Sequence, residues 1–67
     1  MAKIQLNGKK ITIKQKISVF ELIKKYKLDQ KKIALELNGV ILPKSQYLKK
    51  KIKNDDKIEI VHFIGGG

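Results

Sequence analysis

Residues 3–23 read KIQLNGKKITIKQKISVFELI, and the first half of this stretch has the pattern of a β-hairpin. Apolar and polar residues alternate over residues 3–7 and again over residues 10–14, as they do in strands with one buried face. Asn7-Gly8 lies between the two runs, and Asn-Gly is a strong hairpin signal because both residues accept positive φ. The sequence therefore predicts that the chain begins with an antiparallel hairpin.

The second half of the same stretch predicts a helix from about residue 18 to residue 27. Ser18, followed three residues later by Glu21, has the spacing of a capping box, and Ile17 and Leu22 could form a hydrophobic staple around it. Phe20 lies off the main apolar stripe, so we expect it at the rim of the core. Residues at helical spacing predict the buried face of this helix: Val19, Leu22, Ile23 and Tyr26.

The next segment predicts a second, shorter hairpin. Residues 33–37, IALEL, place three apolar side chains on one face of a strand. Asn38-Gly39 is a second tight-turn signal. Residues 40–42 are a short strand that ends at Pro43, because proline cannot donate a hydrogen bond to a sheet.

The last third of the chain predicts an irregular connection and a final strand. We expect residues 44–53 to be irregular or to form one short helical turn, with Tyr47, Leu48 and Ile52 as apolar anchors. A turn at residues 54–56 then leads into a strand over residues 57–63, which runs directly towards the glycines at the C-terminus.

Together these elements predict an α+β fold, in which one helix packs on one face of a sheet of four or five strands. We expect a single domain over residues 1–67, with residues 1–63 folded and residues 64–67 a flexible glycine tail. The opposite face of the sheet should be open. The strand residues expected to face the helix are Ile4, Leu6, Ile11, Ile13, Ile33, Leu35, Leu37, Ile58 and Ile60.

Length and composition exclude several classes of protein. A chain of 67 residues has room for one small core. There is no cysteine, so a disulfide, a zinc knuckle and a thiol nucleophile are excluded. No apolar run approaches the roughly 20 residues of a membrane span. We therefore expect a cytoplasmic domain with no membrane partner.

The net charge of +10 raises the question of nucleic-acid binding. All 16 basic residues are lysines spread along the chain, and there is no arginine for forked contacts to phosphate or guanine. The four aromatic residues are not interleaved with lysines as a stacking platform requires. The sequence thus favours a solvated basic surface, with an acidic protein partner as the second interpretation and nucleic acid as the third.

The side chains that could carry chemistry are few. His62 is the one histidine, and we interpret it as a structural residue near the end of the last strand. Asp55 and Asp56 could form an acid pair, but their place before a strand is typical of a turn. Gly8 and Gly39 belong to hairpins and not to a phosphate-binding loop. We therefore expect no catalytic residue, no metal site and no bound cofactor.

Three of the five glycines are the last three residues, Gly65, Gly66 and Gly67. They could be a frayed end or a remnant without function. Alternatively the tail is the functional part, because a chain without Cβ atoms can enter a narrow channel of another protein. In that case the terminal carboxylate would be the reactive group once an ATP-dependent partner had activated it.

Three apolar residues next to the tail predict a docking surface. Val61 and Phe63 alternate with Ile58 and Ile60, so they should point to the open face of the sheet, and Ile64 continues the apolar run. Exposed apolar patches commonly mark protein contacts. The alternative is that these side chains belong to the core at a twisted strand end.

The motifs that carry a family resemblance span nearly the whole chain. They are the Asn-Gly hairpin, Ser-Val-Phe-Glu-Leu-Ile at the helix start, Glu-Leu-Asn-Gly, and the ending Asp-Lys-Ile-Glu-Ile-Val-His-Phe-Ile-Gly-Gly-Gly. In these the chain resembles the thiamine-biosynthesis sulfur carriers, the ThiS family. The resemblance implies the ubiquitin-like β-grasp fold, a mixed sheet packed on one helix.

The resemblance also implies a function as a carrier and not as an enzyme. A ThiF-type adenylating enzyme would use ATP and Mg to adenylate the carboxylate of Gly67, and sulfur supplied through a cysteine desulfurase would convert it to a thiocarboxylate. The thiazole synthase ThiG would accept that sulfur. Gly65 and Gly66 would thread the tail into these partners.

Other functions remain open at this point. The small subunit of molybdopterin synthase and a ubiquitin-like protein modifier use the same terminal chemistry. A small basic nucleic-acid-binding domain is the alternative from a different class.

Overall fold

The computed structural model describes residues 1–63, and it begins with the predicted hairpin. Strands β1 (Ala2–Leu6) and β2 (Lys9–Ile13) pair antiparallel, with Ile4 opposite Ile11. Asn7 and Gly8 connect them at φ values of 49° and 82°. Both residues therefore adopt the left-handed conformation that a tight hairpin turn requires and that Asn-Gly accepts.

Helix α1 (Val19–Lys25) is shorter than the predicted range of 18–27. Ser18 is its N-cap: the Ser18 hydroxyl accepts a hydrogen bond from the backbone N–H of Glu21, and the Glu21 carboxylate accepts one from the backbone N–H of Ser18. The predicted capping box is confirmed. The helix ends because Tyr26 leaves helical geometry and Lys27 follows at a φ of 56°.

The second half of the chain also follows the predicted order. Its elements are the 3₁₀ turn η1 (Gln30–Lys32), strands β3 (Ile33–Leu37) and β4 (Val40–Ile41), the 3₁₀ turn η2 (Lys44–Gln46), and strand β5 (Lys57–His62). The short helical turn expected within residues 44–53 is η2.

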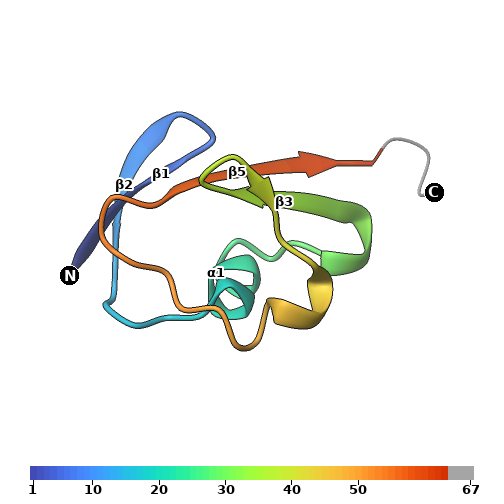
Figure 1. Ribbon diagram of the computed structural model, residues 1–67, viewed down its shortest axis with the longest axis horizontal. Helices are drawn as coiled ribbons and strands as arrows, with labels where there is room; N and C mark the ends of the chain where they lie inside the picture. Colours follow the sequence, from blue (N-terminus) through green and yellow to red (C-terminus); the bar gives the residue numbers. More distant parts are fainter. Residues whose placement is uncertain (64–67) are drawn as a thin grey trace.

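The five strands form one mixed sheet in the order β2-β1-β5-β3-β4 (Figure 1). Strand β5 lies in the middle, parallel to β1 on one side and antiparallel to β3 on the other. Helix α1 lies on one side of this sheet, as Figure 1 shows. The last strand in the sequence is therefore the central strand of the sheet.

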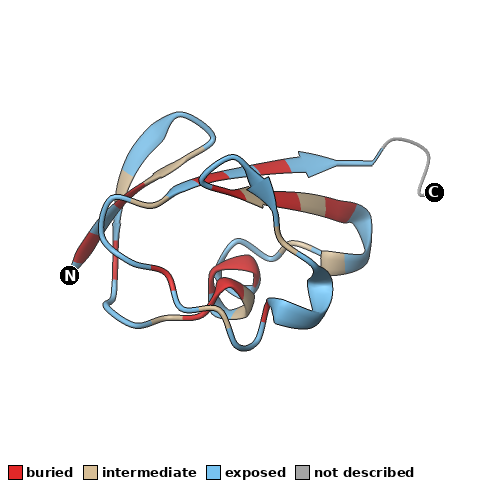
Figure 2. Ribbon diagram, in the orientation of Figure 1, coloured by how far each residue is buried: buried red, intermediate tan, exposed pale blue. Residues whose placement is uncertain are grey.

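Alternation along the strands produces a core between the sheet and the helix (Figure 2). On β3, and on β5 as far as Ile60, every second residue is buried. Leu6 and Ile11, both predicted to face the helix, are only half-buried and pack against the edge of this core, as does Phe20 at the predicted rim. The buried apolar residues are Ala2, Ile4, Ile13, Val19, Leu22, Ile23, Ile33, Leu35, Leu37, Tyr47, Ile52, Ile58 and Ile60.

Two predicted core residues are on the surface. Tyr26 is 42% exposed, because the helix ends one residue earlier and the side chain no longer follows the apolar stripe. Leu48 is 67% exposed, while its neighbours Tyr47 and Ile52 are the buried anchors of that segment. Both predictions were wrong.

Candidate functional site

Strand β5 leads towards the C-terminal glycines, and asparagine side chains from both hairpin turns hold it. The Oδ1 atom of Asn7 accepts a hydrogen bond from the backbone N–H of Ile60 at 2.7 Å. The Oδ1 atom of Asn38 accepts one from the backbone N–H of Lys57 at 2.8 Å. Each Asn-Gly turn therefore has a second role, which is to position the central strand.

Asp56 completes this arrangement at the start of β5. Its carboxylate accepts hydrogen bonds from the Asn38 side-chain amide at 3.0 Å and from the backbone N–H of Lys53 at 2.8 Å. Asp55, which has a φ of 71°, donates its backbone N–H to the carbonyl of Lys3. These contacts are those of a turn, in agreement with the interpretation of both aspartates as turn residues.

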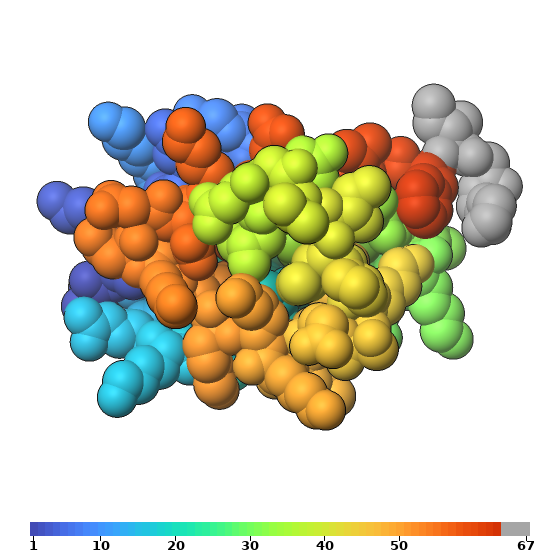
Figure 3. Space-filling view, viewed as in Figure 1, coloured from blue at the N-terminus to red at the C-terminus, as the bar shows by residue number. Residues whose placement is uncertain are grey.

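The end of β5 presents apolar side chains to solvent. Val61 is 60% exposed and Phe63 is 46% exposed, so neither belongs to the core. In the space-filling view this end of the chain lies at one end of the molecule (Figure 3). The exposure expected of the predicted docking residues is therefore present at both positions that the structure describes.

The cross-strand register extends this surface onto the neighbouring strands. Ala34 on β3 is opposite Val61, and Ile41 on β4 is opposite Glu36, which lies two residues further along the same face of β3. Cross-strand partners point to the same face of a sheet. Four residues, which we call the apolar patch, thus share the open face: Ala34, Ile41, Val61 and Phe63.

Phe63 is held in place from two directions. Its backbone N–H donates to the carbonyl of Lys32 at 2.9 Å, which continues the pairing with the β3 side of the sheet beyond β5. The Lys44 Nζ atom lies 5.5 Å from the centroid of the Phe63 ring, within the range of a cation–π contact. The backbone of Phe63 is therefore tied to the sheet, and its exposed ring has a lysine as a neighbour.

Sequence reasoning missed Ile41 and Lys44 as neighbours of the predicted docking residues. Ile41 is 67% exposed, and its alternation within a two-residue strand carries no signal about which face it occupies. Lys44 comes from η2, and its contact with Phe63 depends on how η2 folds back towards β5. Only the register of β4 with β3 could have placed Ile41.

The described residues next to this surface offer no metal site. His62 is exposed beyond the edge of the core, although it lies on the same side of β5 as Ile58 and Ile60. Among residues 1–63, no three His, Cys, Asp or Glu side chains come together in a way that could hold a metal ion. No helix in this described portion is both long and apolar enough to cross a bilayer.

The remaining predicted site residues, Ile64, Gly65, Gly66 and Gly67, lie outside the described residues. Their roles in docking, tail threading and activation stay predictions. The same holds for the predicted boundary between a folded region and a flexible tail.

A mixed five-stranded sheet on one helix, with the last strand at its centre, defines a β-grasp domain, and the sequence that follows this strand ends in glycines. The model of the ThiS family matches residues 3–67, so the chain belongs to the ThiS family. The sulfur carrier protein ThiS of Bacillus subtilis is 38% identical over 65 residues, which cover 96% of this chain and 98% of that protein.

A solved structure gives the same result for the fold. The crystal structure of the thiamine biosynthesis protein ThiS from Geobacter metallireducens matches with a TM-score of 0.83 and 31% sequence identity. The match covers 97% of this chain and 99% of that chain. The predicted β-grasp fold is therefore confirmed.

Another relative is much longer than this chain. A thiazole synthase of Paramagnetospirillum magneticum is 38% identical over 65 residues, which are 97% of this chain but 20% of that protein. A region similar to this chain therefore occurs within a protein named for thiazole synthesis.

Proposed function

We propose that this chain is a sulfur carrier of thiamine biosynthesis and that its reactive group is the carboxylate of Gly67. The observation that carries the proposal is the family match, which runs from residue 3 to Gly67 and so includes the whole glycine ending. The terminal carboxylate is ionised at neutral pH and is a poor electrophile. It therefore needs activation before a sulfur atom can be attached.

The activation has two steps. A carboxylate oxygen of Gly67 attacks the α-phosphate of ATP, which a ThiF-type adenylating enzyme holds with Mg, and pyrophosphate leaves. A cysteine desulfurase supplies sulfur as a persulfide, and a thiol reductant releases it at the oxidation level of sulfide while a disulfide forms. This sulfur then attacks the carbonyl carbon. AMP leaves with the former carboxylate oxygen, one proton is released, and a thiocarboxylate remains on Gly67.

The loaded carrier then delivers its sulfur to a thiazole synthase of the ThiG type. In this scheme the chain is consumed and recharged once per sulfur atom, so it acts as a co-substrate and not as an enzyme. The domain serves as the structure that a partner holds while the tail reacts. The thiazole synthase relative, which contains a region similar to this chain, supports that partner.

In this proposal the partners bind the apolar patch. Val61 and Phe63 are exposed and come just before the C-terminal glycines in the sequence. Ile64 continues the apolar run towards Gly65 and Gly66. Glycines suit a segment that must pass through a narrow channel, because they have no Cβ atom. A partner that binds the patch would thereby receive the tail at a defined distance from its active site.

The proposal can be tested by intact-mass spectrometry. The full chain is incubated with a ThiF-type enzyme, ATP, Mg, a desulfurase with cysteine, and a thiol reductant. We expect one species heavier by the difference between sulfur and oxygen, formed only when ATP is present. A chain without Gly66 and Gly67 is the control, since it keeps residues 1–63 and removes the reacting group.

Two results would contradict the proposal. One is the absence of the heavier species when a known carrier is converted under the same conditions. The other is a heavier species that forms equally on the truncated chain, which would place the sulfur elsewhere.

A further inference from the structure

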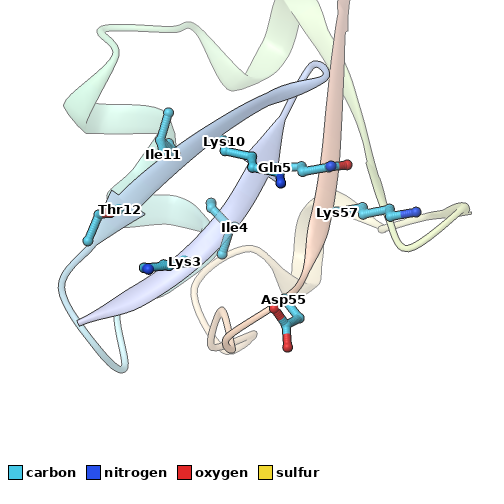
Figure 4. Close-up of a pocket in the computed structure, with 8 residues that line it drawn as sticks. All are labelled: Lys3, Ile4, Gln5, Lys10, Ile11, Thr12, Asp55 and Lys57. Carbon is cyan, nitrogen blue, oxygen red and sulfur yellow. The ribbon is translucent and has the colours of Figure 1, made fainter.

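The open face of the sheet has a basic groove at the end away from the apolar patch. The groove has a volume of about 530 Å³, and three lysines from three neighbouring strands surround it: Lys10 on β2, Lys3 on β1 and Lys57 on β5 (Figure 4). All three lysines are exposed. We call this feature the lysine groove.

Strand register brings these lysines to one face. Gln5 on β1 is opposite Lys10 on one side and Lys57 on the other, and Figure 4 shows its side chain between theirs. Lys3, two residues before Gln5, therefore shares the face and is opposite Thr12. The groove thus combines three ammonium groups with an amide and a hydroxyl group.

Charge in the groove is positive overall. Asp55 is the acidic residue among those that line it, so three lysines and one carboxylate leave a net charge of +2. None of the lining residues is aromatic, so the groove offers no surface for stacking a base. Its chemistry suits carboxylates, which ammonium groups bind as point charges.

The position of the groove relative to the apolar patch limits what can occupy it. Lys57 and Val61 share one face of β5 and are four residues apart, about 13 Å at the rise of a strand. Between them Glu59 lies opposite Glu36, so two carboxylates separate the lysines from Val61. Ile41 of the patch lies in the same row, opposite Glu36. A long polyanion that crossed the sheet would meet these carboxylates, whereas a short acidic segment ends before them.

We propose that the lysine groove receives an acidic segment of the protein that docks on the apolar patch. This inference rests on the proposed carrier function, because it assigns chemistry to the partner's surface. The groove and the patch lie on one continuous face, so a single partner surface can contact both. Attraction between the lysines and the partner's carboxylates would increase the association rate and fix the orientation in which the tail enters.

The first test measures binding of a ThiF-type enzyme that loads the wild-type chain. Reversing the groove charge with Lys3→Glu, Lys10→Glu and Lys57→Glu should weaken binding by about tenfold or more and flatten its dependence on salt. The control carries Lys25→Glu, Lys31→Glu and Lys49→Glu, three exposed lysines that do not line the groove. It has the same net charge and should change affinity by less than about threefold.

Equal effects of the two triple variants would overturn the proposal, because net charge alone would then explain the binding. The carrier function is judged separately by whether the wild-type chain forms the thiocarboxylate. Thermal unfolding of both variants checks that each is folded before binding is measured.

A second test does not depend on the carrier function. A hexaglutamate peptide is titrated into the full chain, and backbone amide shifts are followed by NMR. We expect the largest shifts at Gln5, Thr12 and Lys57, and their loss in the groove variant. Shifts spread over all exposed lysines, or a preference of the groove for an oligonucleotide or pyrophosphate over the peptide, would contradict an acidic protein segment as the occupant.

Discussion

The side chain of Asn7 accepts a hydrogen bond from the backbone N–H of Ile60, although 53 residues separate them in the sequence. The parallel pairing of β1 with β5 covers only Gln5 with Lys57 and Leu6 with Ile58. The backbone N–H of Asn7 still donates to the carbonyl of Ile58 at 2.9 Å, and the Asn7 side chain then accepts the next hydrogen bond, from the N–H of Ile60. The strand that leads to the tail is therefore anchored by a turn residue.

Asn7→Gly tests this anchor. Glycine keeps the positive φ of the turn but leaves the partly buried N–H of Ile60 without its acceptor, so the free energy of unfolding should fall by about 1–2 kcal/mol. Urea denaturation measures the change. Asn7→Asp keeps an acceptor at the same place and should lose less stability than Asn7→Gly. An equal loss in both variants would mean that the hydrogen bond does not carry the effect.

Ser18→Ala removes one half of the capping box. The N–H of Glu21 then loses its acceptor at the start of a helix with only seven residues, and we expect a loss of about 1 kcal/mol. Ser18→Asp provides the control, because aspartate is an equally good N-cap and should retain most of the stability. If Ser18→Ala unfolds like the wild type in urea, the cap contributes nothing measurable.

Phe63→Ala should separate docking from folding. The ring is 46% exposed, so its removal should lower the free energy of unfolding by about 1 kcal/mol or less. Binding to an adenylating enzyme should weaken by about tenfold or more if the ring is an anchor of the interface. Calorimetry or surface plasmon resonance measures the affinity for the adenylating enzyme.

Tyr26→Ala is the matched control for this variant. Tyr26 is an aromatic residue of similar exposure, 42%, at the C-cap of α1 and away from β5. Its removal should leave partner binding within about threefold of the wild type. A Phe63→Ala chain that is unfolded would show that Phe63 is a core residue. A folded Phe63→Ala chain that binds as well as Tyr26→Ala would show that the ring is not an anchor of the docking surface.

Extension of the chain by one residue after Gly67 should abolish activation. The added residue moves the carboxylate beyond the position where the partner presents ATP, while residues 1–63 keep their contacts. Pyrophosphate release in the presence of the adenylating enzyme measures this step. Normal release from the extended chain would show that the carboxylate of Gly67 is not the group that reacts.

Ionisation of Tyr47 should lower the stability of the fold at high pH. Burial raises the pKa of its hydroxyl above the ordinary value of 10.0, and a backbone hydrogen bond at Leu35 offsets part of this increase. Below pH 10 the hydroxyl is neutral in both the folded and the unfolded chain, so it adds no pH dependence. Above pH 10 the unfolded chain loses this proton more readily, and the free energy of unfolding should fall as the pH rises.

Lysines also titrate in this range, so the effect of Tyr47 must be isolated by comparison. Tyr47→Phe keeps the ring and removes the ionisable group. Between pH 9 and pH 11 the free energy of unfolding should fall more for the wild type than for Tyr47→Phe. A constant difference across these pH values would refute a raised pKa in the folded state.

Much of the fold could be predicted because its signals are local. The two Asn-Gly turns, the capping box at Ser18 and the alternation of β3 and β5 each depend on residues a few positions apart. The same kind of signal failed at Tyr26 and Leu48, which are exposed although they follow buried neighbours in the sequence pattern. Hydrophobicity alone does not report whether a residue at the end of an element is buried.

The candidate site was predicted only in part. Alternation along β5 correctly indicated that Val61 and Phe63 are exposed. It could not add Ile41, Lys44 or the lysine groove, because these depend on which strands are neighbours and on their register. The parallel pairing of β1 with β5 brings Lys3 and Lys57 to one groove although 54 positions separate them.

The sequence by itself determined the elements, their order, the turns and the family to which the chain belongs, since each of these is encoded in short-range patterns. Tertiary structure alone decided that β5 is the central strand, that Asn7 and Asn38 hold it, and that lysines, carboxylates and apolar side chains divide the open face into three zones. The physical reason is that hydrogen bonds between strands, and the faces they share, join residues whose separation along the chain carries no local signal.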